Sequence, residues 1–200
     1  MRANGFIGVD IFFVISGFLI TSILLTQLWK GSFSLLDFYI RRVNRIFPAL
    51  ALVVATCLGI GWLTLYANEF KSLGRSIATS AGFVANINFF LEVGYWDISG
   101  KLKPLLHLWS LGVEEQFYLL WPLALWAMWT RRVNIMTTCI MVLAFSLAWN
   151  LHSIQIDQTA TFYLPFARFW ELFAGGGACL RDRSQPAIRR LERASKHTLQ

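Results

Sequence analysis

The stretch IFFVISGFLITSILLTQLW, from Ile11 to Trp29, carries no charged residue. A membrane-spanning helix needs about 20 predominantly apolar residues, and this stretch meets that length. The whole chain of 200 residues is 56% hydrophobic and only 14% charged, whereas average soluble domains carry about a quarter charged residues. Such a chain has too little polar surface to cover a soluble globule, so the composition favours a protein embedded in a bilayer.

Further apolar runs follow the first one along the chain. They are Ile46–Asn68, His107–Thr130, Val133–Leu151 and Phe162–Leu180. Pro48 suits the first turn of the second run. The sequence therefore predicts an all-α protein, a polytopic transmembrane bundle of five spanning helices. The first run is long and no small-residue cleavage pattern follows it, so we interpret it as a retained helix and not as a signal peptide.

The segment Ser76–Leu91 is uncharged but short and mixed in composition. If it does not span, twelve of the eighteen basic residues fall on one side of the membrane, as the positive-inside rule favours. We therefore expect Met1 outside, Gln200 in the cytoplasm, and Glu69–Lys103 as an external loop whose apolar middle dips into the membrane or lies along it. The chain then divides into a transmembrane region, residues 1–180, and a basic cytoplasmic tail, residues 181–200.

The net charge of +7 does not indicate a nucleic-acid partner, because the basic residues lie between and after the apolar runs and form no basic soluble domain. Three cysteines, Cys57, Cys139 and Cys179, lie far apart in apolar runs. Their spacing matches no metal or disulfide pattern, so no metal site is expected.

Polar residues inside the third run share one side of the expected helix. At 3.6 residues per turn, His107, Ser110, Glu114 and Tyr118 fall on one stripe, with Glu115 to one side. Charges within a span cost upwards of about 2.5 kcal/mol each, which makes these residues candidates for function. The set can hold and move a proton or bind a polyol, and we take all five as candidate catalytic residues. The alternative is a polar network that holds helices together.

Charged residues in the first and fifth runs are candidates for a supporting role. Arg168 and Glu171 lie three residues apart and either neutralise each other or pair with Asp10, Glu114 or Glu115 on another helix. Asp10 stands at the entrance of the first run, where it can cap the helix. Gly17 and Thr21 form a small-residue face suited to close helix packing.

A basic cluster precedes the second run. Arg42 and Arg45 lie on one helix face, and Arg41 and Arg45 also share a face. On the cytoplasmic side these arginines can bind the phosphates of an acyl-coenzyme A. The alternative is ordinary anchoring by positive charge.

Four stretches together resemble the acyltransferase 3 family of integral-membrane acyltransferases. They are Gly5–Asp10 continuing into Phe12–Leu19, then Arg41–Pro48, His107–Tyr118 and Arg168–Leu172. The third stretch is highly specific to that family, and the order and spacing of all four also agree with it.

This resemblance implies transfer of an acyl group, usually acetyl, from acetyl-coenzyme A to a sugar hydroxyl. The acceptor would be an envelope polysaccharide, lipopolysaccharide or glycolipid, and the enzyme would be a multi-pass protein of the bacterial inner membrane. Acetyl-coenzyme A would act as a co-substrate, with no bound cofactor. Arg42 and Arg45 match the Arg-x-x-Arg motif that the family is thought to use for the donor.

The resemblance also has a departure. Family members carry a helix with a catalytic histidine before the stretch that begins at Gly5, and further helices after the one that holds Glu171. We therefore carry over no catalytic histidine from the family, because His107 belongs to a different motif. We expect an incomplete copy that is inactive alone, and we allow that the remaining helices come from another chain. A proton-coupled transporter and a non-catalytic membrane scaffold are the alternatives from other functional classes.

Overall fold

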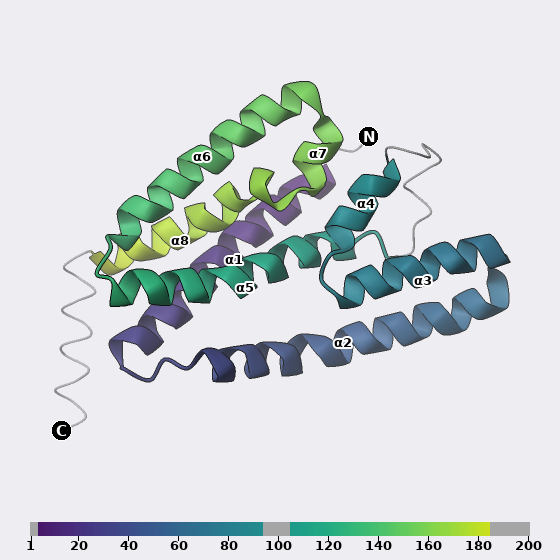
Figure 1. Cartoon of the computed structure of the whole chain (residues 1–200), viewed down its shortest axis with the longest axis horizontal. Coiled ribbons are helices and arrows are strands. Elements are labelled where there is room, and N and C mark those ends of the chain that lie inside the picture. The colour runs from purple at the N-terminus through teal and green to yellow at the C-terminus, as the bar shows by residue number, and fades with distance from the viewer. Residues whose placement is uncertain (1–3, 94–104, 185–200) are drawn as a thin grey trace. The chain divides into compact units, whose positions relative to one another are not determined.

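The computed structural model describes residues 4–93 and 105–184, and every regular element in these two ranges is helical (Figure 1). The all-α prediction is confirmed. The helices are α1 Asn4–Trp29, α2 Leu35–Thr64, α3 Ala67–Ala81, α4 Ala85–Val93, α5 Leu108–Thr130, α6 Ile135–Ile156, α7 Gln158–Tyr163, the 3-10 turn η2 Pro165–Ala167, and α8 Phe169–Ser184.

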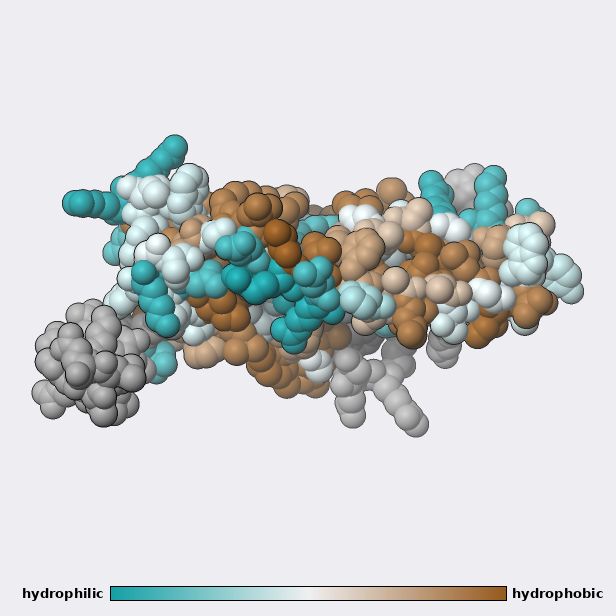
Figure 2. Space-filling model, turned by 90° about the horizontal axis from the view of Figure 1, so that it is seen from below, coloured by the Kyte–Doolittle hydropathy of each residue, from teal (hydrophilic) through white to brown (hydrophobic). Residues whose placement is uncertain are grey.

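Three of the described helices are long and apolar enough to cross a membrane by length and composition: Ile7–Trp29 of α1, all of α2, and all of α6. Helices α5 and α8 do not meet the same criterion, so five crossings remain a prediction. Large apolar side chains are exposed along the spanning helices, among them Leu52, Leu63 and Met141, and apolar side chains make up much of the face in Figure 2. Exposed apolar surface of this kind fits a lipid environment. The chain is therefore a multi-pass membrane protein.

Helix α2 begins earlier than the sequence predicted. The Ser34 hydroxyl accepts a hydrogen bond from the backbone N–H of Asp37 at 3.3 Å, which caps the helix. Pro48 consequently lies inside α2 and not in its first turn, so that expectation was wrong. Proline is tolerated inside membrane helices because neighbouring groups satisfy the backbone. The basic cluster of Arg41, Arg42 and Arg45 therefore stands on a continuous helix.

The expected loop Glu69–Lys103 is helical in its described part. Helices α3 and α4 fill most of it, separated by a turn at Gly82–Val84 in which Phe83 adopts a left-handed φ of 55°. The remainder of the expected loop lies outside the described residues. The membrane position of the segment stays a prediction.

The fifth expected span is interrupted. Asp157 caps α7 by accepting from the backbone N–H groups of Thr159 and Ala160, and Pro165 then opens a 3-10 turn before α8. A proline lacks the backbone N–H that a continuous helix needs, which explains the break. Of the expected fifth span, α8 is the helix that contains Glu171. The basic tail lies outside the described residues from residue 185 onward.

The chain divides into two compact units, each described by itself. Unit 1 comprises residues 1–33, 120–152 and 166–200, and its centre is the crossing of α1 with α8. A Cβ on Gly17 would collide with the backbone of Leu172, and one on Gly175 with the carbonyl of Val14. The expected small-residue face of α1 is confirmed, because only glycine allows two helix backbones to approach this closely.

Unit 2 comprises residues 34–119 and 153–165, and so contains α2, α3, α4, α7 and the first part of α5. Figure 1 shows α3 running alongside α2. The α4 side chain Asn86 donates to the backbone carbonyl of Tyr163 at 3.2 Å, which joins α4 to α7. Trp109 packs its ring against Phe162, with centroids 4.3 Å apart, and fastens α5 to α7.

Candidate functional site

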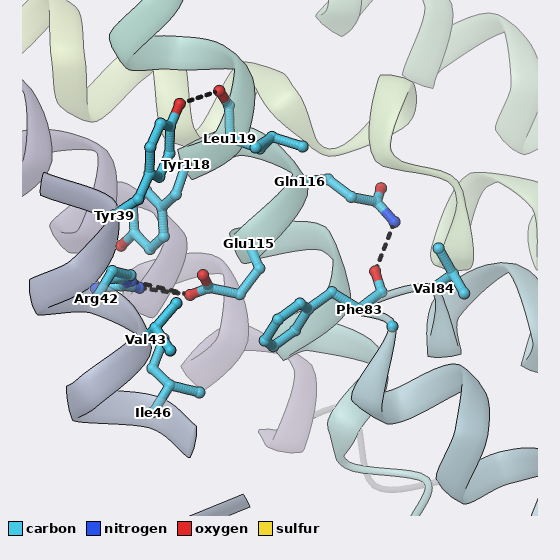
Figure 3. A pocket seen from close by; sticks show the side chains of 11 residues that line it. Tyr39, Arg42, Val43, Ile46, Phe83, Val84, Glu115, Gln116, Tyr118 and Leu119 are labelled. Carbon is cyan, nitrogen blue, oxygen red and sulfur yellow. Dashed lines mark hydrogen bonds and ion pairs between the residues drawn. The ribbon is translucent and has the colours of Figure 1, made fainter. Parts of the chain in front are cut away.

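The first charged cluster joins α2 to α5 in unit 2 (Figure 3). Arg42 donates from both Nε and Nη2 to Oε1 of Glu115, at 3.0 and 2.8 Å. Charged residues of this kind are held inside membrane proteins by pairing with one another. The structure thus brings together a predicted donor-binding arginine and a predicted catalytic carboxylate.

Two residues of the predicted stripe complete this cluster. The Arg42 guanidinium lies 3.7 Å from the centre of the Tyr118 ring, a cation–π contact. The Tyr118 hydroxyl donates to Oε1 of Glu114 at 2.5 Å, and that carboxylate lies 3.6 Å from Arg42 Nη2. One guanidinium therefore faces two carboxylates, so the cluster carries a net charge of −1 when both acids are ionised.

A pocket of about 280 Å³ opens beside this cluster. Its walls come from α2, α5 and the turn between α3 and α4; they are Tyr39, Arg42, Val43, Ile46, Gly82, Phe83, Val84, Glu115, Gln116, Tyr118 and Leu119. Tyr39 donates to the backbone carbonyl of Leu119 at 2.8 Å and closes one side. Most of the wall is apolar, and the Arg42–Glu115 pair supplies its charge.

The first two residues of the predicted stripe do not reach the pocket. His107 is exposed and precedes the first residue of α5. The Ser110 hydroxyl donates to the backbone carbonyl of His107 at 3.1 Å. The stripe is therefore divided: Glu114 and Tyr118 join Arg42, while Ser110 bonds only to the nearby backbone.

The other two basic residues of the cluster do not pair with the acids. Arg41 and Arg45 are exposed, and neither makes an ion pair or a side-chain hydrogen bond with another residue of the described ranges. Their guanidinium groups keep their full capacity for an external anion. The three arginines thus differ in role: Arg42 is engaged internally, and Arg41 and Arg45 are available.

Gln116 is a site residue that sequence reasoning missed. Its side-chain amide donates to the carbonyl of Phe83 and to Oδ1 of Asn86, both at 3.0 Å. These bonds hold the α3–α4 turn against α5 and keep Phe83 at the pocket wall. A glutamine inside an apolar run was the available signal, since polar residues there require a partner.

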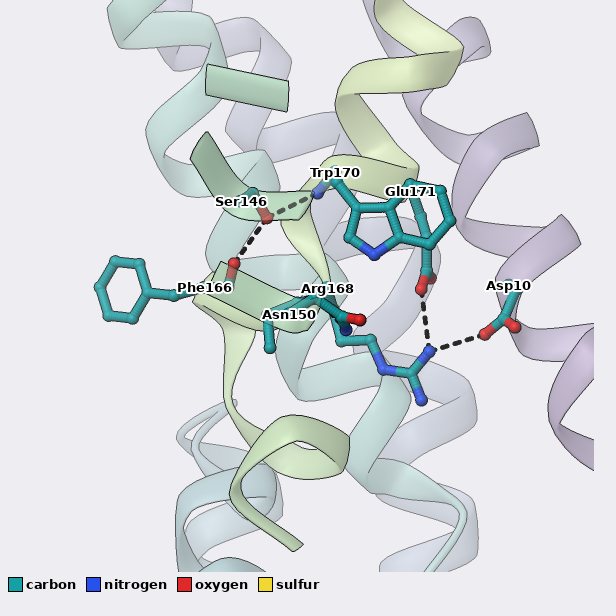
Figure 4. A network of polar contacts seen from close by, with 8 residues as sticks. Asp10, Ser146, Asn150, Phe166, Arg168, Trp170 and Glu171 are labelled. Carbon is teal, nitrogen blue, oxygen red and sulfur yellow. Dashed lines mark hydrogen bonds and ion pairs between the residues drawn. The ribbon is translucent and has the colours of Figure 1, made fainter. Parts of the chain in front are cut away.

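The second charged cluster lies in unit 1 (Figure 4). Arg168 Nη1 donates to Oδ1 of Asp10 and to Oε1 of Glu171, both at 2.8 Å. Asp10 therefore pairs across helices. It lies inside α1, which begins at Asn4, so its expected role as a helix cap was wrong.

Side chains of α6 form hydrogen bonds with the backbone at the break that precedes α8. The Ser146 hydroxyl donates to the carbonyl of Phe166 at 2.6 Å and accepts from the backbone N–H of Trp170 at 2.9 Å. Asn150 donates to the carbonyl of Ala167 at 2.8 Å. These bonds satisfy backbone groups that a broken helix leaves open. The sequence signal was weak, because Ser146 and Asn150 are small polar residues without a motif.

Neither unit contains an evident metal centre in its described part: no group of three histidine, cysteine or acidic side chains within residues 4–93 and 105–184 can hold a metal ion.

The chain is similar in sequence to known proteins. The model of the acyltransferase domain family known as acyltransferase 3 matches residues 1–191. An uncharacterized protein of Haemophilus influenzae is 39% identical over 83% of this chain and 71% of its own length. The peptidoglycan O-acetyltransferase OatA of Listeria monocytogenes is 38% identical over 86% of this chain and 29% of its own length.

The putative peptidoglycan O-acetyltransferase YrhL of Bacillus subtilis is 34% identical over 98% of this chain and 32% of its own length. The chain therefore spans less than a third of the Listeria and Bacillus relatives. No solved structure matches the chain.

Proposed function

The chain belongs to the acyltransferase 3 family, and from this premise we propose that it serves a membrane enzyme that transfers an acetyl group from acetyl-coenzyme A to a hydroxyl of an envelope glycan. The names of the Listeria and Bacillus relatives make peptidoglycan the favoured glycan. Lipopolysaccharides and glycolipids are the other envelope acceptors within this proposal. The enzyme would reside in the bacterial inner membrane, where cytoplasmic acetyl-coenzyme A and external glycan are both accessible.

The observation that carries this proposal is the apolar pocket with one arginine in its wall and two exposed arginines on the same helix. The pocket wall contains the Arg42–Glu115 pair, while Arg41 and Arg45 on the same helix remain exposed. An acyl-coenzyme A has the matching character, because its phosphates are anionic and its acyl thioester is apolar. Arg41 and Arg45 would bind the phosphates through charge-assisted hydrogen bonds, and the thioester would enter the pocket.

The two acids of the cluster, Glu114 and Glu115, can take part in transferring the proton of the attacking hydroxyl. Attack by a hydroxyl on the thioester carbonyl forms an ester bond, breaks the carbon–sulfur bond, and releases the hydroxyl proton. Coenzyme A leaves as a thiolate, which takes up that proton from the acid that held it and departs as the free thiol. Glu114 and Glu115 together exceed the single charge of Arg42, so this cluster can accept that proton. The Tyr118 hydroxyl, which already donates to Glu114, can pass it along. Handling the proton in this way does not depend on His107, which lies outside the pocket.

The donor site can be tested by binding, independently of turnover. We expect Arg45→Gln, in the full chain reconstituted into lipid nanodiscs, to weaken acetyl-coenzyme A binding about tenfold. That is the effect of losing one charge-assisted hydrogen bond of about 1.4 kcal/mol. Titration calorimetry measures the Kd, and Arg131→Gln provides a matched control, because Arg131 is also exposed but belongs to unit 1 and not to α2, the helix that carries Arg42 and Arg45.

Equal Kd values for Arg45→Gln and Arg131→Gln would remove Arg45 from the donor site. No saturable binding of acetyl-coenzyme A to the unaltered chain would overturn the donor assignment as a whole. Transfer itself is measured as labelled acetyl recovered from peptidoglycan by mild alkali after incubation with labelled acetyl-coenzyme A.

A further inference from the structure

Glu171 presents an unusual polar atom in the interior of unit 1. Its side chain is fully buried, at 0% exposure, and its Oε1 accepts from Arg168. Its Oε2 is buried and accepts no hydrogen bond from any residue of the described ranges. A buried carboxylate oxygen without a donor is costly, so the position calls for a group that donates to it.

The neighbouring side chain presents the complementary atom. The indole Nε1 of Trp170 is buried and donates to no acceptor within the described ranges. Trp170 and Glu171 are consecutive in the first turn of α8. Figure 4 shows the indole nitrogen and the Glu171 carboxylate both pointing toward the Arg168 guanidinium. One buried acceptor and one buried donor therefore face the same part of the cluster.

The Trp170 donor and the Glu171 acceptor together restrict which chemical groups can satisfy both atoms. A group that satisfies both atoms must donate one hydrogen bond and accept another, which the oxygen of a hydroxyl group or of a water molecule does. An ammonium group donates but cannot accept, and an ether or carbonyl oxygen accepts but cannot donate. Lipid chains supply neither function.

Solvent exposure differs among the three charged side chains of this cluster. Side-chain exposure is 0% at Glu171, 12% at Arg168 and 40% at Asp10. The exposed fraction thus rises from the unsatisfied carboxylate through the guanidinium to Asp10 on α1. The partly exposed Asp10 carboxylate can accept a hydrogen bond from a second hydroxyl, so a polyol suits this cluster better than a simple alcohol.

We propose that Trp170 Nε1 and Glu171 Oε2 bind a hydroxyl group of the acceptor sugar, with Asp10 and Arg168 orienting the polyol at the entrance. This inference rests on the proposed function and names the acceptor side of the reaction. It assigns the α8 cluster to the glycan and leaves the α2–α5 pocket to the acyl donor.

The experiment measures binding of a peptidoglycan disaccharide to the full chain in nanodiscs, by saturation-transfer NMR and without acetyl donor. Trp170→Phe removes the indole N–H and keeps an aromatic ring, and we expect it to weaken binding about three- to tenfold. Glu171→Gln replaces the carboxylate by a neutral amide, and we expect a loss of about tenfold or more. Trp149→Phe is the matched control, because Trp149 is an exposed tryptophan of α6.

A second probe isolates the donated hydrogen bond. The same disaccharide with its hydroxyls methylated accepts hydrogen bonds but donates none through those positions, so it should bind the unaltered chain more weakly. Methylation should matter less in Glu171→Gln, because the neutral amide oxygen is a weaker acceptor than the carboxylate. Acetyl-coenzyme A should bind both α8 variants with an unchanged Kd.

The outcomes separate this inference from the proposed function. If acetyl-coenzyme A binds with the expected dependence on Arg45 but the disaccharide does not saturate, or if it binds Trp170→Phe and Glu171→Gln as it binds Trp149→Phe, the hydroxyl site is overturned and the donor site stands. Disaccharide binding that depends on Trp170 and Glu171 supports the hydroxyl site even if acetyl-coenzyme A fails to bind.

Discussion

The two charged clusters use the same set of charges in different ways. In unit 2 Arg42 faces Glu114 and Glu115, and in unit 1 Arg168 faces Asp10 and Glu171. Each cluster therefore sets one guanidinium against two carboxylates inside a helical membrane protein. They differ in what surrounds the acids.

In unit 2 an aromatic ring and a hydroxyl complete the set. Tyr118 contacts the guanidinium with its ring and donates to Glu114 with its hydroxyl, and the cluster borders an apolar pocket. In unit 1 a single nitrogen of Arg168 serves both acids, and Oε2 of Glu171 is left without a donor among the described residues. Equal charge therefore does not imply equal function: one cluster borders an apolar pocket, and the other holds a buried carboxylate oxygen without a donor among the described residues.

The largest effect should come from removing the cation of unit 1. Arg168→Gln leaves Asp10 and the buried Glu171 without a positive partner, and we expect it to lower the free energy of unfolding by about 3 kcal/mol. Unfolding of the chain in mixed micelles, titrated with SDS, measures this change. Arg131→Gln removes an exposed arginine and should change stability by less than about 0.5 kcal/mol. Similar stabilities for the two variants would show that the Arg168 cluster does not hold unit 1 together.

The next largest effect tests the helix crossing that carries this cluster. Gly175→Ala places a methyl group against the backbone carbonyl of Val14, and overpacking of this kind costs about 1–3 kcal/mol. Gly177 has nothing within 4 Å of a Cβ, so Gly177→Ala should be neutral or stabilise by up to about 1 kcal/mol. The same SDS titration distinguishes them, and equal effects would contradict the close α1–α8 approach.

The cluster in unit 2 should tolerate loss of its cation better. Side-chain exposure is 18% at Arg42 and 10% at Glu115, so solvent and the Tyr118 ring moderate the loss. We expect Arg42→Gln to cost about 2 kcal/mol, and a double-mutant cycle with Glu115→Gln to give a coupling of about 1 kcal/mol. Arg41→Gln combined with Glu115→Gln should be additive. A cost for Arg42→Gln that exceeds the cost for Arg168→Gln would reverse the comparison.

The smallest effect concerns the wall of the unit 2 pocket. Gln116→Leu leaves the Phe83 carbonyl and Asn86 Oδ1 without their shared donor, and we expect a cost of about 1 kcal/mol. Gln155→Leu, at an exposed position of α6, should cost nothing measurable. The affinity for acetyl-coenzyme A should fall with Gln116→Leu alone, because the α3–α4 turn is released. An unchanged affinity would separate this turn from the donor site.

Sequence reasoning found most of the charged residues of both clusters but few of their neutral partners. Charged residues inside apolar runs are visible because they are rare and costly there. Gln116, Ser146 and Trp170 were missed, since each has an ordinary place in a membrane helix. Their importance arises from backbone groups and buried atoms that only the folded chain brings within reach.

Helix boundaries were predicted less well than helix existence. Pro48 suggested the start of a helix, but α2 begins at Leu35, directly after the Ser34 cap and thirteen residues before Pro48. Pro165, by contrast, does interrupt its run. The two prolines have the same local chemistry, and neighbouring groups decide whether the backbone that each one disturbs is satisfied in place.

The amino-acid sequence alone determined that this protein is helical and membrane-embedded, and which charges enter its interior, because hydropathy and helical periodicity are properties of neighbouring residues. Only the tertiary structure decided which acid each arginine pairs with and which carboxylate oxygen is left over. The partners are 73 residues apart for Arg42 and Glu115 and 158 residues apart for Asp10 and Arg168. Ion pairing depends on distances of a few ångströms between helices, and no local pattern in the chain encodes those distances.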